Sequence, residues 1–356
     1  MLRTAVIAAS IVAVPLVLWL VIGGARGGRQ IIDNPGQLKR ELDRLAARLR
    51  PLEGKVGASQ QTGPGDYERF LTIEGRKRRY ELHVPPGYKA DTPMPLVLSF
   101  HGGGGRAGLS RIQTQLDSKA DDADFIVAYP DGSGRFARRL LTWNAGRCCG
   151  YAKEQNVDDV AFVNAILDDV QAFFAIDSYR VYATGHSNGA MMCYRIACEL
   201  SERIAAIAPV GATMGVDACE PARPVSIMHF HGTADPNSPY NGGVGKHSLS
   251  KVEFMSVDRC IEDWRRRDGC DSPPVETRKQ DEATIVTCRA ESGVEVVLVG
   301  IEGMGHTWPG GRRLAKESFS GALNQKISAN DMMWEFFTRH SLKADGEVAT
   351  TRRSSP

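Results

Sequence analysis

The segment VYATGHSNGAMM, residues 181–192, is the stretch from which we interpret the rest of the chain. Its β-branched and aromatic residues predict a strand, and Gly185 predicts an abrupt turn into a following helix. A serine at such a turn has a strained backbone, so the residues two before and two after it need to be small. Gly185 and Gly189 meet that requirement around Ser187. The segment therefore predicts a nucleophile elbow, which presents a serine hydroxyl and points the first amides of a helix at an incoming carbonyl.

Length and composition set broad limits. A chain of 356 residues can bury one full-sized core and carry an N-terminal appendage. The net charge of +2 gives no reason to expect nucleic acid as a partner. No cysteine or histidine cluster has zinc spacing, so we expect no metal site. We expect a monomer that acts on a small or oligomeric substrate.

The chain begins with an apolar run over residues 4–22, which carries no charge. A run of this length suits either a long signal peptide or a single membrane anchor. Small residues permit cleavage after Ala25, whereas the basic residues that follow favour retention as an anchor. Residues 1–25 are therefore predicted to be a signal peptide or anchor, and in both cases the remaining chain is extracytoplasmic, secreted or periplasmic.

Composition divides the rest of the chain into three parts. Residues 26–66 are predicted to be a linker with a short amphipathic helix, because leucines recur at helical spacing before a Gly/Ser/Gln/Pro-rich stretch. The catalytic domain is predicted over residues 67–342 and a polar tail over 343–356.

The eight cysteines agree with export, because an even number in an exported chain suggests disulfide bonds. Cys148 and Cys149 are adjacent, and a ring closed between neighbours is strained. We therefore expect each of them to bond elsewhere.

Strand and helix patterns alternate through the catalytic domain. Pro95–Phe100 is a continuous apolar run, typical of a strand covered on both faces. Further strands are predicted over 70–73, 79–84, 124–129, 180–183, 204–210, 225–230 and 294–299, and helices over 160–174 and 330–340. This alternation predicts an α/β domain whose central sheet is mostly parallel and flanked by helices.

Reactive groups in such sheets gather beyond the carboxyl ends of the strands. Asp235 follows the strand over 225–230, where an acid could orient a histidine and stabilise its charged form. The rival acids are less well placed. Asp131 precedes the elbow, and Asp158 and Asp159 look like helix-start residues.

His306 lies in a glycine-rich loop after the last predicted strand, from which an imidazole can reach a serine. The resulting order is Ser187, Asp235, His306, which is the order of a hydrolase triad of this architecture. Four other histidines are less well placed. His83 lies in an early strand and His186 in the elbow. His229 lies in a buried strand and His340 at the end of the last helix.

His101–Gly105 follows the strand over 95–100. A run of glycines lets the backbone approach a ligand and present amides to it, which predicts an oxyanion pocket. We assign it to the amides near Gly103 and Gly104, together with that of Asn188, and expect His101 itself to be structural. The alternative is a flexible loop. Two tryptophans, Trp143 and Trp308, also allow two interpretations. They either line the substrate pocket or pack in the core.

Together these motifs resemble the polyhydroxybutyrate depolymerase-like esterases, a group similar to the feruloyl and acetylxylan esterases of carbohydrate esterase family 1. The resemblance extends over residues 68–342. The segments that carry it are 101–105, 143–150, 157–160, 185–192, 197–199, 231–235 and 305–311.

The resemblance implies an α/β-hydrolase fold and an exported serine ester hydrolase without cofactors. Carried over to this chain, it makes Ser187 the nucleophile, Asp235 the acid and His306 the base. The resemblance also implies a disulfide bond between Cys270 and Cys288. It implies a second one between Cys198 and either Cys148 or Cys149. It implies no pairing for Cys193 or Cys260, whose state stays open.

Enzymes of this group that attack solid polyester usually carry an additional substrate-binding domain, whereas a short polar tail follows residue 342 here. We therefore expect soluble oligomeric or plant-wall esters as substrates. Two alternatives stay open: a serine peptidase of the same fold, and a non-catalytic, surface-anchored carbohydrate-binding protein.

Overall fold

The computed structural model describes residues 62–136, 138–248, 251–270 and 275–342. The predictions for residues 1–25, for most of the linker and for the polar tail lie outside these residues. Among the residues that are described, no helix is long and apolar enough to cross a membrane. The first strand begins at Gly65, slightly before the predicted start of the catalytic domain.

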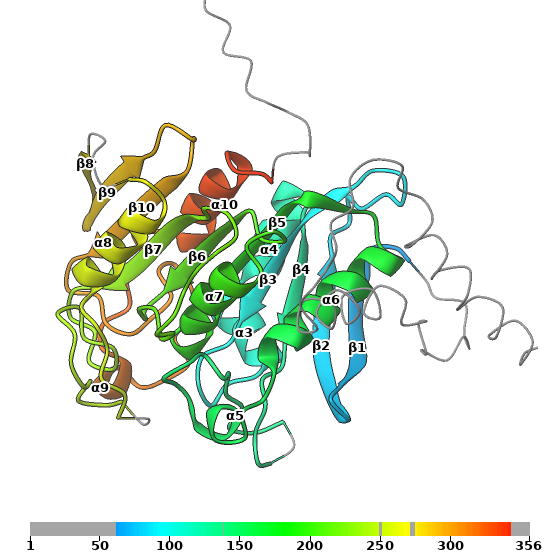
Figure 1. The fold of residues 1–356 in the computed structure, drawn as a ribbon, viewed down its shortest axis with the longest axis horizontal. Coiled ribbons are helices and arrows are strands. Elements are labelled where there is room, and N and C mark those ends of the chain that lie inside the picture. The colour runs from blue at the N-terminus through cyan, green and yellow to red at the C-terminus, as the bar shows by residue number, and fades with distance from the viewer. Residues whose placement is uncertain (1–61, 137, 249–250, 271–274, 343–356) are drawn as a thin grey trace, which may run out of the picture. The chain divides into compact units, whose positions relative to one another are not determined.

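The described residues form one sheet of ten strands with helices on both faces (Figure 1). The strands are β1 (Gly65–Ile73), β2 (Arg76–Val84), β3 (Met94–Phe100), β4 (Ile126–Pro130), β5 (Ile176–His186), β6 (Ala206–Val210), β7 (Ser226–Gly232), β8 (Val275–Gln280), β9 (Ala283–Arg289) and β10 (Glu295–Ile301). The helices are α3 (Ala107–Thr114), α4 (Leu116–Ala123), α5 (Gly150–Glu154), α6 (Asp159–Phe173), α7 (Asn188–Glu199), α8 (Val257–Arg267), α9 (Glu317–Ser320) and α10 (Ala329–Thr338).

The strand order is β1-β2-β4-β3-β5-β6-β7-β10-β9-β8. From β4 to β10 in this order, neighbouring strands are parallel. Antiparallel hairpins close both edges, β1 with β2 and β9 with β8. The predicted mostly parallel sheet is therefore confirmed. Because β3, β5, β7 and β10 run in one direction, the loops that follow them meet beyond one end of the sheet.

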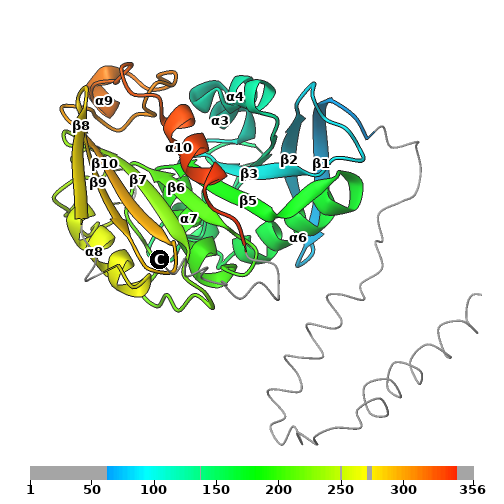
Figure 2. The same cartoon turned by 90° about the horizontal axis from the view of Figure 1, so that it is seen from above.

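Two helical layers cover the sheet, with α6, α7 and α8 on one face and α3, α4 and α10 on the other (Figure 2). Phe162, Tyr194 and Trp264 bring large buried side chains from the first layer, and Leu116 and Phe336 do so from the second. Every residue of β3, β7 and β10 is buried. This two-sided coverage explains why the central strands have continuous apolar sequences rather than alternating ones.

The adjacent cysteines differ from the prediction. Cys148 and Cys149 are bonded to one another rather than to distant partners, so the expectation from ring strain is wrong for this pair. Cys198, at the end of α7, is bonded to Cys219, and the Cα atoms are 5.0 Å apart. That separation lies within the usual range for a disulfide bond. Because Cys198 is bonded to Cys219, the implied pairing of Cys198 with Cys148 or Cys149 is also wrong.

Cys270 and Cys288 are buried free thiols rather than the implied disulfide bond. They are nevertheless neighbours, because Cys288 Sγ lies 2.7 Å from the carbonyl oxygen of Cys270. Cys193 and Cys260 are also buried and free.

Candidate active site

Ser187 lies in the turn between β5 and α7 with φ 57° and ψ −122°, a backbone conformation that residues with side chains rarely adopt. Its N–H donates to the carbonyl of Val210 at 2.9 Å, which ties the turn to β6. A Cβ atom on Gly185 would lie 2.6 Å from the carbonyl oxygen of Gly189, and one on Gly189 would collide with the carbonyl of Phe100. The need for small residues on both sides of the serine is therefore steric.

Asp235 and His306 follow β7 and β10, which are neighbouring parallel strands. His306 Nδ1 lies 2.7 Å from Asp235 Oδ2. The other carboxylate oxygen accepts hydrogen bonds from the backbone N–H groups of Asn237 and Ser238, each at 2.8 Å. Burial raises the pKa of Asp235, but the facing imidazole and these hydrogen bonds outweigh it, so the net pKa lies below the ordinary 3.8. The carboxylate is thus held ionised and oriented toward His306.

Ser187 and His306 both line a cavity of about 820 Å³. The His306 ring packs beside that of His186, which precedes the serine, with ring centroids 4.6 Å apart. Because His306 Nδ1 bonds to Asp235, its Nε2 is the nitrogen left to accept a proton from a hydroxyl. The structure therefore brings the three predicted catalytic residues to the same end of the sheet.

The glycine loop after β3 lies directly against the elbow. A Cβ atom on Gly102 would lie 3.4 Å from Ser187 Cβ, and one on Gly103 would lie 3.7 Å from Asn188 Cβ. Both are ordinary contact distances, so the loop backbone packs against Ser187 and Asn188. A steric need for glycine is found at Gly105, where a Cβ atom would lie 2.9 Å from the carbonyl oxygen of Gly102.

Two amides of this region are candidates to hold a developing negative charge. Asn188 is the first residue of α7, so its N–H has no carbonyl partner within the helix. The N–H of Gly103 has no acceptor among the described residues. The N–H of Gly104 instead donates to the carbonyl of Leu141 at 2.8 Å. The prediction therefore needs correction at Gly104, whose amide is already occupied.

Side chains behind the loop fix its position. Asn188 accepts from the N–H of Trp143 at 2.7 Å and donates to its carbonyl at 3.2 Å. The indole N–H of Trp143 donates to the carbonyl of His101 at 2.9 Å. His101 Nδ1 donates to the Gly102 carbonyl at 2.7 Å, which leaves Nε2 to accept from the N–H of Gly132 at 3.0 Å. Burial lowers the pKa of His101 to about 4, so this neutral tautomer persists at neutral pH.

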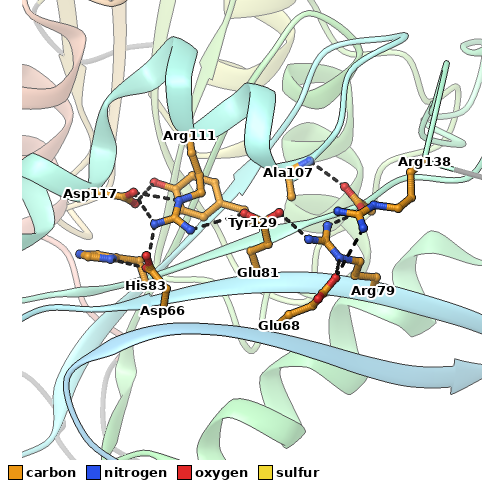
Figure 3. Close-up of polar contacts among 11 residues, drawn as sticks. Asp66, Glu68, Arg79, Glu81, His83, Ala107, Arg111, Asp117, Tyr129 and Arg138 are labelled. Carbon is orange, nitrogen blue, oxygen red and sulfur yellow. Dashed lines mark hydrogen bonds and ion pairs between the residues drawn. The ribbon is translucent and has the colours of Figure 1, made fainter.

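Asp131, the first rival acid, supports the same loop. Its carboxylate accepts from the backbone N–H of Ala107, where α3 begins, at 2.7 Å, and pairs with Arg79 at 2.8 Å. Figure 3 shows Arg79 and Arg111 among several carboxylates between β1, β2 and α3. Asp131 therefore anchors α3, the helix that follows the glycine loop. The carboxylate that bonds to His306 is that of Asp235.

The remaining rival acids also have other partners. Asp158 caps α6 by accepting from the N–H of Ala161 at 2.8 Å. Asp159 is fully buried and pairs with Arg78 at 2.7 Å. Neither carboxylate contacts His306.

Of the two possibilities predicted for Trp308, the structure shows packing in the core, so its assignment to the substrate pocket needs correction. Its side chain is fully buried in the core beside α10, and its indole N–H donates to Asn330 Oδ1 at 3.1 Å. It does not line the cavity that contains Ser187. Much of the apolar lining comes from residues to which the sequence analysis gave no role: Leu109, Leu140, Met191, Val252, Phe254, Leu314 and Phe319.

The amides that hold Asp235 were also missed. Asp235-Pro236-Asn237-Ser238 has the composition of a turn in which an aspartate accepts from backbone N–H groups that follow it. That composition was the available signal.

In the part of the chain that the structure describes, no group of three or more His, Cys, Asp or Glu residues is arranged to hold a metal.

Comparison with known proteins agrees with this geometry. A family model described as esterase PHB depolymerase matches residues 78–248. NocK of Nocardia uniformis subsp. tsuyamanensis, provisionally named an esterase, is 29% identical over 313 residues, covering 81% of this chain and 86% of NocK. Feruloyl esterase B of Piromyces equi is 31% identical over 236 residues, 64% of this chain. The aligned region spans only 42% of that enzyme.

Among solved structures, an acetyl xylan esterase from Aspergillus awamori superposes with a TM-score of 0.53 at 16% identity. The match covers 77% of this chain and 99% of that one. At this identity the likeness establishes the fold alone, which is the expected α/β-hydrolase fold. Fold and relatives together define a carboxylic ester hydrolase. More particularly, residues 78–248 resemble the esterases of the PHB depolymerase family.

Proposed function

We propose that this protein is an exported serine esterase that cleaves its substrate through an acyl-enzyme. The single observation that carries the proposal is the bond between His306 Nδ1 and Asp235 Oδ2, beside a serine held in an elbow conformation. This arrangement provides a nucleophile, a base with a defined tautomer and an ionised acid at one cavity.

In the proposed reaction, His306 Nε2 takes the proton of Ser187 as the hydroxyl oxygen attacks the ester carbonyl. Asp235 keeps the other imidazole proton in place and stabilises the charged ring. The amides of Gly103 and Asn188 hold the oxyanion, each contributing about 3 kcal/mol in comparable sites. His306 then protonates the leaving alcohol, and water attacks the acyl-enzyme by the reverse sequence.

We propose soluble oligomeric or plant-wall esters as substrates rather than solid polyester. The cavity of about 820 Å³ has room for a drug-sized ligand and is lined by both glycine backbone and apolar side chains. Two relatives are named feruloyl esterase B and bifunctional acetylxylan esterase/xylanase XynS20E. The chain is expected to act as a monomer without a cofactor.

Export is supported by features of the sequence. The apolar run over residues 4–22 suits a signal peptide or an anchor. The disulfide bond between Cys198 and Cys219 is of the kind that persists outside the cytoplasm.

The test is a substrate panel run on the wild type and on Ser187→Ala. It comprises nitrophenyl esters of short and long acids, methyl ferulate, acetylated xylan, hydroxybutyrate oligomers and a matched amide. We expect ester hydrolysis that falls on the order of 10⁵-fold in Ser187→Ala. Ser178→Ala is the matched control, because this exposed serine lies at the opposite end of β5.

Three results would contradict the proposal. Ester hydrolysis that survives in Ser187→Ala would exclude the serine mechanism. Faster cleavage of the amide than of the ester would favour a peptidase. Binding of the polysaccharide without any turnover would favour a carbohydrate-binding protein.

A further inference from the structure

A row of buried polar side chains lies behind the catalytic acid and has no part in the reaction described above. Tyr194 comes from α7, and His229 and His231 come from β7, where alternate residues share one face of the sheet. The Tyr194 hydroxyl lies 2.9 Å from His229 Nδ1. His229 Nε2 lies 3.0 Å from His231 Nδ1. All three side chains are fully buried, so each polar atom needs a protein partner.

The last partner in the row fixes the direction of every hydrogen bond. His231 Nε2 lies 2.8 Å from the carbonyl oxygen of Ser238, which can only accept, so this nitrogen carries the proton. In a neutral ring the Nδ1 of His231 is then an acceptor, and His229 Nε2 must donate to it. His229 Nδ1 is in turn an acceptor, which leaves the Tyr194 hydroxyl as its donor. One neutral tautomer of each imidazole satisfies the whole row.

The row ends on the turn that holds Asp235. Ser238 accepts from His231 through its carbonyl and donates its N–H to Asp235 Oδ1 at 2.8 Å. His306 binds the other oxygen of the same carboxylate. A shift of this turn would therefore rotate the carboxylate relative to the His306 ring.

Charge explains why the row is neutral. His231 Nε2 lies 3.6 Å from Asp235 Oδ2, which is too long for a hydrogen bond but close enough for a strong interaction between charges. A cation at His231 would compete with His306 for the carboxylate. Burial lowers the pKa of His231 although Asp235 opposes that shift, and burial next to His231 lowers the pKa of His229 well below its ordinary value. Both rings therefore stay uncharged at neutral pH.

We propose that Tyr194, His229 and His231 are positioning residues for the esterase reaction, forming a one-directional row of hydrogen bonds that fixes the orientation of Asp235 without adding charge beside it. This inference rests on the proposed serine mechanism. It gives a reason for two histidines in the centre of a buried strand, where apolar residues would pack without needing any partner.

Cys260, whose state the sequence left open, is a buried free thiol beside this row. Its thiol contacts the side chain of Tyr194, and its sulfur accepts from the N–H of Met214 at 3.4 Å. Burial raises the pKa of Cys260 to about 11, so the thiol stays protonated at neutral pH and adds no charge beside Tyr194.

The experiment compares His231→Leu with His231→Gln. The glutamine amide can reach the position of Nε2 and donate to Ser238, whereas leucine fills the space without a donor. We expect kcat to fall about tenfold or more in His231→Leu with KM within about twofold, because the loss affects the transition state rather than binding. His231→Gln is expected to keep kcat within about threefold of the wild type.

A second variant and a second readout guard against loss of folding. Tyr194→Phe removes one hydroxyl far from the cavity lining, and it should lower kcat about threefold with KM unchanged. The proton resonance of the hydrogen bond between His306 and Asp235 is recorded for each folded variant. We expect this resonance to weaken or shift in His231→Leu and to persist in His231→Gln.

The outcomes separate this inference from the proposed function. Folded His231→Leu with wild-type kcat and an unchanged resonance would overturn the positioning role. Equal losses in the leucine and glutamine variants would do the same, because packing alone would then explain them. A wild type that hydrolyses no ester would refute the proposed function, while the resonance would still show whether the row orients Asp235.

Discussion

The glycine loop and Asp235, the proposed catalytic acid, are each held by a polar network, but one network is charged and the other is neutral. Beside the glycine loop, Arg79 pairs with Glu81 at 2.6 Å and with Asp131 at 2.8 Å, and Asp131 also binds the first amide of α3 (Figure 3). Arg111 pairs with Asp66 at 2.7 Å in the same network. Asp131 is buried, but the other groups lie near the edge of the sheet, where partial exposure to water makes charge tolerable.

Behind the acid, in contrast, Tyr194, His229 and His231 are fully buried and uncharged. Two histidines show the difference directly. Burial would lower the pKa of His83 in the charged network, but its hydrogen bonds to Asp66 and the Asp121 carboxylate raise it. Burial lowers the pKa of His231 despite the nearby Asp235.

The difference shows what each region requires. The glycine loop needs only to be held, so strong ion pairs at the edge serve it well. In the proposed mechanism Asp235 must direct its charge at His306 alone, and the side chains behind it are neutral. We therefore expect changes beside the loop to affect mainly stability and changes behind the acid to affect mainly turnover.

The largest effect is expected from Asp235→Asn. The amide keeps the shape of the carboxylate but cannot hold the required tautomer of His306, so kcat should fall on the order of 10³- to 10⁴-fold. Initial-rate kinetics on a nitrophenyl ester measure the change. Asp158→Asn is the control, because asparagine also caps a helix well. A loss of less than tenfold would exclude Asp235 as the acid of the triad.

A smaller effect, on stability, is expected from Asp131→Ala. This change leaves the buried amide of Ala107 without an acceptor and removes one partner of Arg79, which should lower the free energy of unfolding by about 2 kcal/mol. Urea denaturation measures the loss, with the exposed Asp122→Ala as control. If Asp131→Ala instead kept its stability and lost turnover, the expectation that changes beside the glycine loop affect mainly stability would be wrong.

The pH dependence of stability should have opposite signs in the two regions. The raised pKa of His83 contributes stability that is present below its unfolded pKa of 6.5 and lost as pH rises through the folded value. The lowered pKa of His229 contributes stability that is present above 6.5 and lost as pH falls toward the folded value. Each such group changes the free energy of unfolding by at most about 1.4 kcal/mol per pH unit.

Two variants test that prediction by urea denaturation at about pH 5.5 and about pH 8, on either side of the unfolded pKa. His83→Gln should lose more stability at the lower pH than at the higher. His229→Leu should lose less at the lower pH than at the higher. The same sign for both variants would contradict the contrast between a charged and a neutral network.

The smallest effect is expected from Glu68→Gln. Glu68 is exposed and pairs with Arg79, which keeps Glu81 and Asp131 as partners after the change. Such exposed pairs contribute little, so thermal unfolding should show no measurable shift. A clear loss of stability would mean that the charged network acts as one cooperative unit.

The sequence predicts those parts of the molecule whose local structure requires particular residue types. The elbow around Ser187 was predictable because steric limits demand glycine two residues on either side. The buried strands were predictable from continuous apolar runs, and the order of acid and base followed from the ends of those strands. The α8 helix was missed although Val257, Ile261 and Trp264 recur at helical spacing on its buried face.

Other features depend on contacts that no local pattern contains. All residues of β8 are exposed, so this edge strand has no hydrophobic alternation to detect. Gly104 is one of four consecutive glycines, and only the distant carbonyl of Leu141 distinguishes its amide from that of Gly103. Trp308 has the same composition signal whether it packs in a core or lines a pocket.

Labelling with a fluorophosphonate, followed by peptide mapping, tests the central claim most directly. We expect one label per folded molecule on Ser187, no label in Ser187→Ala, and much slower labelling when His306 is replaced by alanine. A wild type that stays unlabelled at neutral pH, or a label that persists in Ser187→Ala, would contradict the proposed catalytic site.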